Sequence, residues 1–106
     1  MANITLTGIS GKQYSYEIFG IEQKFRAVAG NYAFVMKTPA QSYSILYVGE
    51  TSDFSQRFND QHIGLECSKR KGATHVFIRV NSGGNQARLD EETDIRKNYN
   101  PDCNKQ

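Results

Sequence analysis

The sequence predicts a small α/β domain of the α+β type, in which helices flank an antiparallel sheet. Its length of 106 residues suits one domain with a single core. Residues 3–19 and 31–49 each hold two strand-like segments separated by turn residues, which is the pattern of β-hairpins. A helical segment, a further strand and a second helical segment follow them. We therefore expect one domain over residues 1–106, with an N-terminal hairpin extension (1–29) in front of the core (30–104).

The composition, with 38% hydrophobic and 23% charged residues, is that of a globular protein. A formal charge of +2 does not demand a nucleic-acid partner but permits one, DNA or RNA. No apolar run approaches the ~20 residues that span a bilayer, and residues 1–10 lack the pattern of a signal peptide. We therefore expect no membrane partner and a cytoplasmic location.

The two cysteines, Cys67 and Cys103, could pair, but in a reducing compartment two free thiols are the default expectation. A closed zinc site would require both cysteines to converge with His62 and His75. No close ligand spacing supports such a site.

The first half of the chain is predicted to form two hairpins. Residues 3–8 and 13–19 alternate in polarity around a glycine-containing turn, and residues 31–37 and 43–49 flank a loop that contains Pro39. Residues 20–30, between the hairpins, could hold one helical turn or an irregular crossing segment.

The second half is predicted to alternate between helix, loop and strand. Thr51 or Ser52 can cap a helix over residues 53–62, on which Phe54 and Phe58 form an apolar stripe. Residues 64–72 are predicted to be a loop and residues 73–80 a strand.

Residues 86–98 form the best helical segment, and the tail after it is expected to be extended. Four positions of this segment follow helical spacing and are predicted to share a face: Leu89, Glu92, Ile95 (or Arg96) and Tyr99. Glu92 should therefore lie close to the inward-facing edge of the helix.

Several residues in these elements suit phosphate chemistry. Tyr47 ends a strand, and Gly49 gives room for a phosphate to approach the backbone just before a helix begins. Arg57, on that helix, offers a planar fork of donors, although it could equally pair with Asp53 or Asp60 on the surface. Tyr47, like Tyr32 on the neighbouring strand, could also be an ordinary core residue.

The remaining candidates also have two interpretations. His62 suits a helix end as well as a catalytic site. Glu92 could instead stabilise its helix through an arginine four residues away, Arg88 or Arg96. Lys69, Arg70 and Lys71 could contact a nucleic-acid backbone or simply form a solvated turn.

Taken in order, these residues resemble the GIY-YIG nuclease domain over residues 30–104. The matching blocks run from the Gly30-Asn31-Tyr32 triplet through the Tyr47-Val48-Gly49-Glu50-Thr51 block, Arg57 and Glu92 to the closing segment Tyr99–Asn104. The family fold implies a central three-stranded antiparallel sheet flanked by helices. The N-terminal hairpin would be an addition to it.

The resemblance implies a metal-dependent endonuclease that hydrolyses phosphodiester bonds in DNA, with RNA as a further possible substrate. Glu92 would bind one Mg²⁺ (or Mn²⁺), and Arg57 would neutralise charge on the scissile phosphate. Tyr32 and Tyr47 would position or deprotonate the attacking water, and Asn104 would help to orient the site. Gly49, Gln61, Lys69 and Arg70 are the expected substrate-binding residues.

One departure from the family pattern keeps alternatives open. Gln61 stands where members usually have His or Tyr, and His62 follows one residue later. The alternative functions are therefore a catalytically weak or inactive nucleic-acid-binding module and a protein-interaction domain. Target specificity could come from the hairpin, from a homodimer or from a partner protein.

Overall fold

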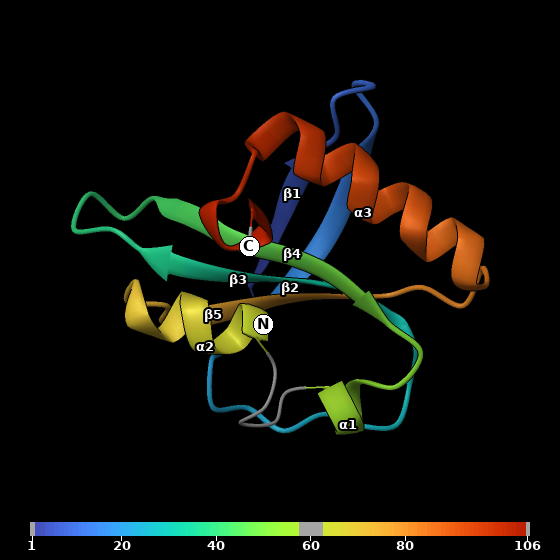
Figure 1. Ribbon diagram of the computed structural model, residues 1–106, viewed down its shortest axis with the longest axis horizontal. Helices are drawn as coiled ribbons and strands as arrows, with labels where there is room; N and C mark the ends of the chain where they lie inside the picture. Colours follow the sequence, from blue (N-terminus) through green and yellow to red (C-terminus); the bar gives the residue numbers. More distant parts are fainter. Residues whose placement is uncertain (1, 58–62, 106) are drawn as a thin grey trace.

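The computed structural model describes residues 2–57 and 63–105, which form one five-stranded antiparallel sheet with helices around it (Figure 1). The strands are β1 (Asn3–Thr7), β2 (Gln13–Gly20), β3 (Gly30–Lys37), β4 (Tyr43–Thr51) and β5 (His75–Val80). The helices are α1 (Phe54–Arg57), α2 (Ile63–Arg70), α3 (Asn85–Tyr99) and the 3-10 turn η1 (Asp102–Lys105). The α+β class and all five predicted strands are confirmed.

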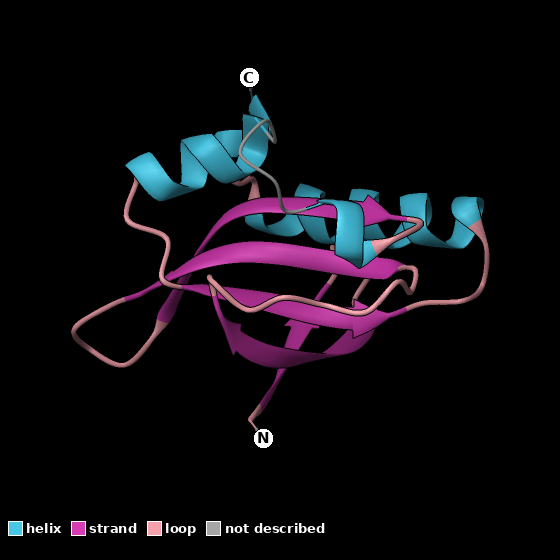
Figure 2. Ribbon diagram, turned by 90° about the horizontal axis from the view of Figure 1, so that it is seen from below, coloured by secondary structure: helices cyan, strands magenta, loops and turns pink. Residues whose placement is uncertain are grey.

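The N-terminal hairpin is an integral part of the sheet. The strand order is β1-β2-β5-β3-β4, because β2 pairs with β5 from Glu17 opposite Ile78 to Gly20 opposite His75. Among the described residues, the sheet therefore has five strands, where the family fold implied three. Figure 2 shows the strands as one curved layer. The sequence predicted the hairpin but carried no signal for its pairing partner.

The two faces of the sheet carry different side chains because residues alternate along each strand. Ala33 and Val35 of β3 face α3 and pack with Ile95, whereas Tyr32 and Phe34 face the opposite way. That second face is covered by α1, α2 and the irregular segment at residues 21–29. Figure 1 shows α3 on one side of β4 and the two shorter helices on the other.

The predicted loop at residues 64–72 is wrong, since most of it belongs to α2. Leu65, Cys67 and Ser68 are buried, and the Ser68 hydroxyl donates to the Gly64 carbonyl oxygen at 2.6 Å. Burial of this apolar stripe stabilises a helix that glycines and lysines alone would not favour.

The helix predicted at residues 53–62 is present over α1, and residues 58–62, including Phe58, lie outside the described residues. The Asp53 carboxylate accepts the Ser55 amide hydrogen at 2.9 Å, and the Thr51 hydroxyl accepts that of Asp53 at 3.1 Å. Asp53 therefore caps the helix, and Thr51 holds the cap in place.

The helix predicted at residues 86–98 is confirmed as α3, but its buried stripe differs from the prediction. Arg88, Glu91 and Ile95 are buried, whereas Leu89 and Tyr99 are each 37% exposed. The stripe is displaced because polar side chains of the sheet bind Glu91. Hydrophobicity alone could not identify this face.

The C-terminal tail is folded and covalently attached, contrary to the expectation of an extended tail and two free thiols. Cys103 of η1 forms a disulfide with Cys67 of α2, 36 positions earlier in the chain. Both cysteines are buried beside Leu46 of β4. Contacts of this separation leave no local signal in the sequence.

Within residues 2–57 and 63–105, none of the helices has both the length and the apolar character needed to cross a bilayer.

Candidate functional site

The two candidate tyrosines lie side by side on the face that α1 and α2 cover. The ring centroids of Tyr32 and Tyr47 are 6.1 Å apart, and Tyr47 also stacks on Phe34 at 5.9 Å. Tyr32 is fully buried, while Tyr47 is half-buried. The site therefore holds one tyrosine inside the core and one at its margin.

Gly49 leaves the space that the Tyr32 side chain occupies. The two residues are direct neighbours across the β3–β4 pair, and a Cβ atom at Gly49 would lie 2.5 Å from the Tyr32 hydroxyl oxygen. Any larger residue would displace the tyrosine. Tyr32 therefore lies across β4, with its hydroxyl group directed toward the outer strand of the sheet.

The first helix begins three residues after β4 and brings its backbone close to the tyrosines. The ring of Phe54, its first residue, lies 6.4 Å from that of Tyr32. Arg57 is the last residue of α1, and its side chain lies outside the described part of the chain. Gln61 and His62 lie outside the described residues altogether.

Glu92 is half-buried on α3. Arg88, one turn earlier, donates from Nε to the carboxylate of Glu50 at 3.1 Å, and Glu50 directly follows Gly49. This ion pair, with side chains only 9% and 19% exposed, fixes the α3 flank beside the end of β4. Arg88 thus binds Glu50, where the sequence suggested a pair with Glu92.

The donor set near Glu92 suits a water-rich divalent cation. Among the described residues, no three His, Cys, Asp or Glu side chains gather into a metal-binding group. One carboxylate with water completing the shell is a common arrangement for Mg²⁺, which dehydrates reluctantly. Glu92 fits that arrangement because it is a hard oxygen ligand with partial access to solvent.

Asn104 acts on the site through the backbone of β4. Its Oδ1 atom accepts the Val48 amide hydrogen at 2.7 Å, and its Nδ2 atom donates to the Val48 carbonyl oxygen at 2.9 Å. Val48 lies between Tyr47 and Gly49. Asn104 thus holds the backbone of β4 between Tyr47 and Gly49, and its catalytic role stays a prediction.

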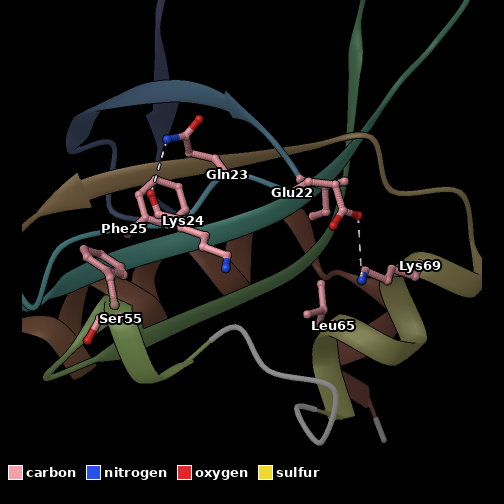
Figure 3. Close-up of a pocket in the computed structure, with 9 residues that line it drawn as sticks. Glu22, Gln23, Lys24, Phe25, Ser55, Leu65 and Lys69 are labelled. Carbon is pink, nitrogen blue, oxygen red and sulfur yellow. Dashed lines mark hydrogen bonds and ion pairs between the residues drawn. The ribbon is translucent and has the colours of Figure 1, made fainter.

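The predicted substrate-binding cations Lys69 and Arg70 lie on α2. Arg70 is within 3.8 Å of Glu66, four residues earlier, and Lys69 is within 3.9 Å of Glu22. All four side chains are at least 46% exposed, so these ion pairs are weak. Lys69 borders a pocket on the same face as the tyrosines (Figure 3).

The structure contains a buried polar network that the sequence did not indicate. Glu91, 4% exposed, accepts hydrogen bonds from Tyr16 at 2.5 Å, Arg79 at 2.8 Å and Asn81 at 3.2 Å. Asn81 also donates to Asn31, which is fully buried. The network joins α3 to both hairpins. The residues that donate to Glu91 lie 10 to 75 positions from it along the chain, which is farther than a local sequence pattern reaches.

Burial determines the ionisation of this network. It raises the pKa of the Glu91 carboxyl group, although the bonds from Tyr16 and Arg79 act in the opposite direction. Burial and the Glu91 charge together raise the pKa of Tyr16. The network therefore serves the fold, because its titratable groups are directed at one another.

Asp94 attaches the first turn of the sheet to α3. Its carboxylate accepts hydrogen bonds from the Ser10 amide at 2.9 Å, the Ser10 hydroxyl at 2.7 Å and the Tyr14 hydroxyl at 2.9 Å. The bonds from Ser10 lower the pKa of Asp94, while burial and the bond to Asp94 raise that of Tyr14 to about 12. Asp94 is thus a structural carboxylate.

The resemblance to the GIY-YIG domain rests on the order and type of the residues described above. Comparison of the chain with family models, with curated proteins and with solved structures found no match in any of the three.

Proposed function

We propose that this protein is a metal-dependent endonuclease of the GIY-YIG type that hydrolyses phosphodiester bonds in DNA. The observation that carries the proposal is the pair of tyrosines on β3 and β4, whose ring centroids are 6.1 Å apart, with Phe54 of α1 6.4 Å from Tyr32. The absence of a side chain at Gly49 lets Tyr32 reach the outer strand. Strands β4, β3 and β5, in that order, would correspond to the three-stranded core of the family.

The two tyrosines would divide the work according to their burial. Tyr47, which is half-buried, can reach a water molecule at the margin of the core. Tyr32, fully buried beside it, would hold Tyr47 and the end of β4 in place. A tyrosine needs help to accept a proton near neutral pH, since its ordinary pKa is about 10. By the family resemblance, the positive charge of Arg57 would provide that help.

Glu92 would hold the divalent cation, Mg²⁺ or Mn²⁺. When bound, such an ion supplies a positive charge that polarises the phosphate and lowers the pKa of water. The chain's own contribution is a half-buried carboxylate on α3, one turn after the Arg88 that pairs with Glu50 of β4. Positioning and charge stabilisation account for most of the catalysis in phosphoryl transfer.

The proposal is tested by nicking of supercoiled plasmid in the presence of Mg²⁺ or Mn²⁺. We expect Glu92→Gln to reduce nicking roughly 10²- to 10³-fold, the usual effect of losing one group that stabilises the transition state. Asp90→Asn is the matched control, because it removes an exposed carboxylate from the same helix. Equal nicking by both variants, or none by the wild-type protein, would disprove the endonuclease proposal.

A binding module without turnover is the second candidate, and the full burial of Tyr32 favours it. A hydroxyl group that solvent does not reach can position a neighbour but cannot activate water. In that case the wild-type protein would retain plasmid without nicking it, and Glu92→Ala would leave the affinity unchanged. Raising the salt concentration would weaken retention steeply.

A further inference from the structure

A pocket of about 360 Å³ lies on the tyrosine-bearing face, between the segment that follows β2 and the helices α1 and α2 (Figure 3). Its apolar lining includes Phe25, Phe54 and Leu65, and its polar lining includes Lys24 and Lys69. The volume is near the lower end of the range for small-ligand sites, roughly 300–1,000 Å³. The pocket therefore suits one small planar group with a charged substituent.

The apolar lining supplies aromatic rings for stacking. Phe25 is half-buried and packs edge-on against Phe19, with ring centroids 5.2 Å apart and an interplanar angle of 81°. It also lies 6.2 Å from Phe54. These contacts fix the ring of Phe25 at the pocket. A fixed aromatic ring provides the platform on which proteins stack unpaired bases.

The polar lining holds two lysines, Lys24 and Lys69, together with Glu22, Gln23 and Ser55. Lys24 is exposed, and Figure 3 shows its ammonium group extending toward the space between α1 and α2. Lys69 is 46% exposed and contacts Glu22, which is itself 83% exposed, at 3.9 Å. Two lysines thus face one loosely held carboxylate. The resulting positive charge suits the phosphate groups of a nucleic-acid strand.

The pocket and the tyrosines share one phenylalanine. Phe54 lies 6.2 Å from Phe25 on the pocket side and 6.4 Å from Tyr32 on the other. A strand whose scissile phosphate reached the tyrosines would therefore bring a neighbouring nucleotide to the pocket. Paired bases cannot enter it, because they remain stacked inside the duplex.

We propose that this pocket binds an unpaired nucleotide of the DNA strand, stacked on Phe25 with its phosphate between Lys24 and Lys69. The inference rests on the proposed function and defines the substrate further as DNA with a single-stranded segment beside the cleaved bond. Selectivity for such DNA would thus arise from the segment that links the N-terminal hairpin to the rest of the sheet.

The test is binding of a fluorescent 15-nucleotide oligothymidylate and of a duplex of the same length, measured by anisotropy in EDTA so that no cleavage occurs. We expect the wild-type protein to prefer the single strand. Phe25→Leu, which keeps an apolar side chain, should weaken single-strand binding roughly 5- to 150-fold, as loss of one stacked base does. Phe25→Tyr, which keeps an aromatic ring, should bind the single strand about as tightly as the wild-type protein does.

The lysines are tested by the salt dependence of binding. Lys24→Gln should reduce the slope of log Kd against log salt by about 0.7, the value for one phosphate contact on a single strand. Lys97→Gln is the matched control, because Lys97 is exposed on α3, which covers the opposite face of the sheet. Urea unfolding of each variant shows whether it is folded under the binding conditions.

The outcomes separate this inference from the nuclease proposal. Glu92-dependent nicking with equal affinity for single strand and duplex would overturn the pocket inference alone and leave the pocket to a protein segment. Unchanged single-strand binding by folded Phe25→Leu would overturn it too. A single-strand preference that requires Phe25, in a protein that nicks no DNA, would support the pocket and refute the nuclease.

Discussion

The two faces of the sheet differ in what their polar side chains contact. Beneath α3, the polar side chains bind one another: Glu91 alone accepts hydrogen bonds from three of them. On the opposite face, aromatic rings surround Tyr32 and Tyr47, and a pocket with two lysines opens beside them. A buried network with satisfied partners stabilises one arrangement of the chain. The α3 face therefore holds the fold together, and the aromatic face is where a ligand can bind.

Glu91 and Glu92 are adjacent on α3 but differ in burial. Glu91 faces the sheet and is 4% exposed, whereas Glu92 lies half-buried on the flank of the same helix. Of these two adjacent carboxylates, Glu91 belongs to the buried network, and Glu92 is the proposed metal ligand. Comparing a substitution of Glu91 with one of Glu92 is the most direct way to separate an effect on stability from an effect on activity.

The largest effect is expected from Glu91→Ala. Removing the carboxylate breaks its hydrogen bonds with buried Tyr16 and with Arg79, whose side chain is 35% exposed. Together these bonds are worth about 3–5 kcal/mol, since a hydrogen bond to a charged group contributes roughly 1.5–3 kcal/mol. Urea unfolding measures the loss. Glu92→Ala should cost less than about 1 kcal/mol. Similar unfolding free energies for the two variants would contradict the division between the faces.

The next effect is expected from breaking the Cys67–Cys103 disulfide, which joins α2 to η1 at the β4 edge. Reduction should lower the free energy of unfolding by about 2–4 kcal/mol, because the unfolded chain regains freedom. Hydrogen exchange should accelerate in α2, on the aromatic face, more than in α3. The double variant Cys67→Ala/Cys103→Ala should not respond to reductant. Equal acceleration in both helices would show that the two faces do not open separately.

A smaller effect is expected from Gly49→Ala. The added methyl group would collide with the buried Tyr32 side chain at 2.5 Å, and overpacking of this kind costs about 1–3 kcal/mol. The melting temperature and the rate of plasmid nicking should both fall. Gly20→Ala is the matched control, since a Cβ atom there meets nothing within 4 Å. Equal behaviour of the two variants would show that Tyr32 does not depend on Gly49.

The smallest effect concerns the pH dependence that Asp94 gives to the α3 face. Its pKa in the folded chain lies below the ordinary value of 3.8, so its stabilising contribution is fully present above that value and is lost as the pH falls through the folded pKa. Asp94→Asn should therefore be less stable than wild type near neutral pH, and the difference should narrow below about pH 4. A constant difference for Asp94→Asn would contradict the assignment.

Local patterns were sufficient for the strands and for α3, but they failed where burial depends on distant contacts. The loop prediction for residues 64–72 followed from two glycines and three basic residues, yet Leu65 and Cys67 pack against β4 and α2 results. The inward face of α3 was placed at Leu89, because hydrophobicity favours it. Glu91 is buried instead, since Tyr16 and Arg79 bind it.

The sequence likewise predicted one part of the candidate site and missed another. The positions of Tyr32, Tyr47 and Gly49 on adjacent strands follow from the predicted hairpin, and the structure brings the two rings within 6.1 Å. The family resemblance implied that Asn104 helps to orient the site, but the sequence did not show through which contact. Its contact with Val48, 56 positions away, exists only once η1 packs on the edge strand.

The sequence by itself determined where the strands, turns and main helix lie and which candidate site residues they carry, because periods of two and 3.6 residues depend on near neighbours. Only the tertiary structure decided that the N-terminal hairpin joins the sheet through β5, that Cys67 meets Cys103, and that Glu91 is buried while Glu92 is not. Each of these depends on contacts between distant segments, and such contacts become favourable only when the whole core is assembled.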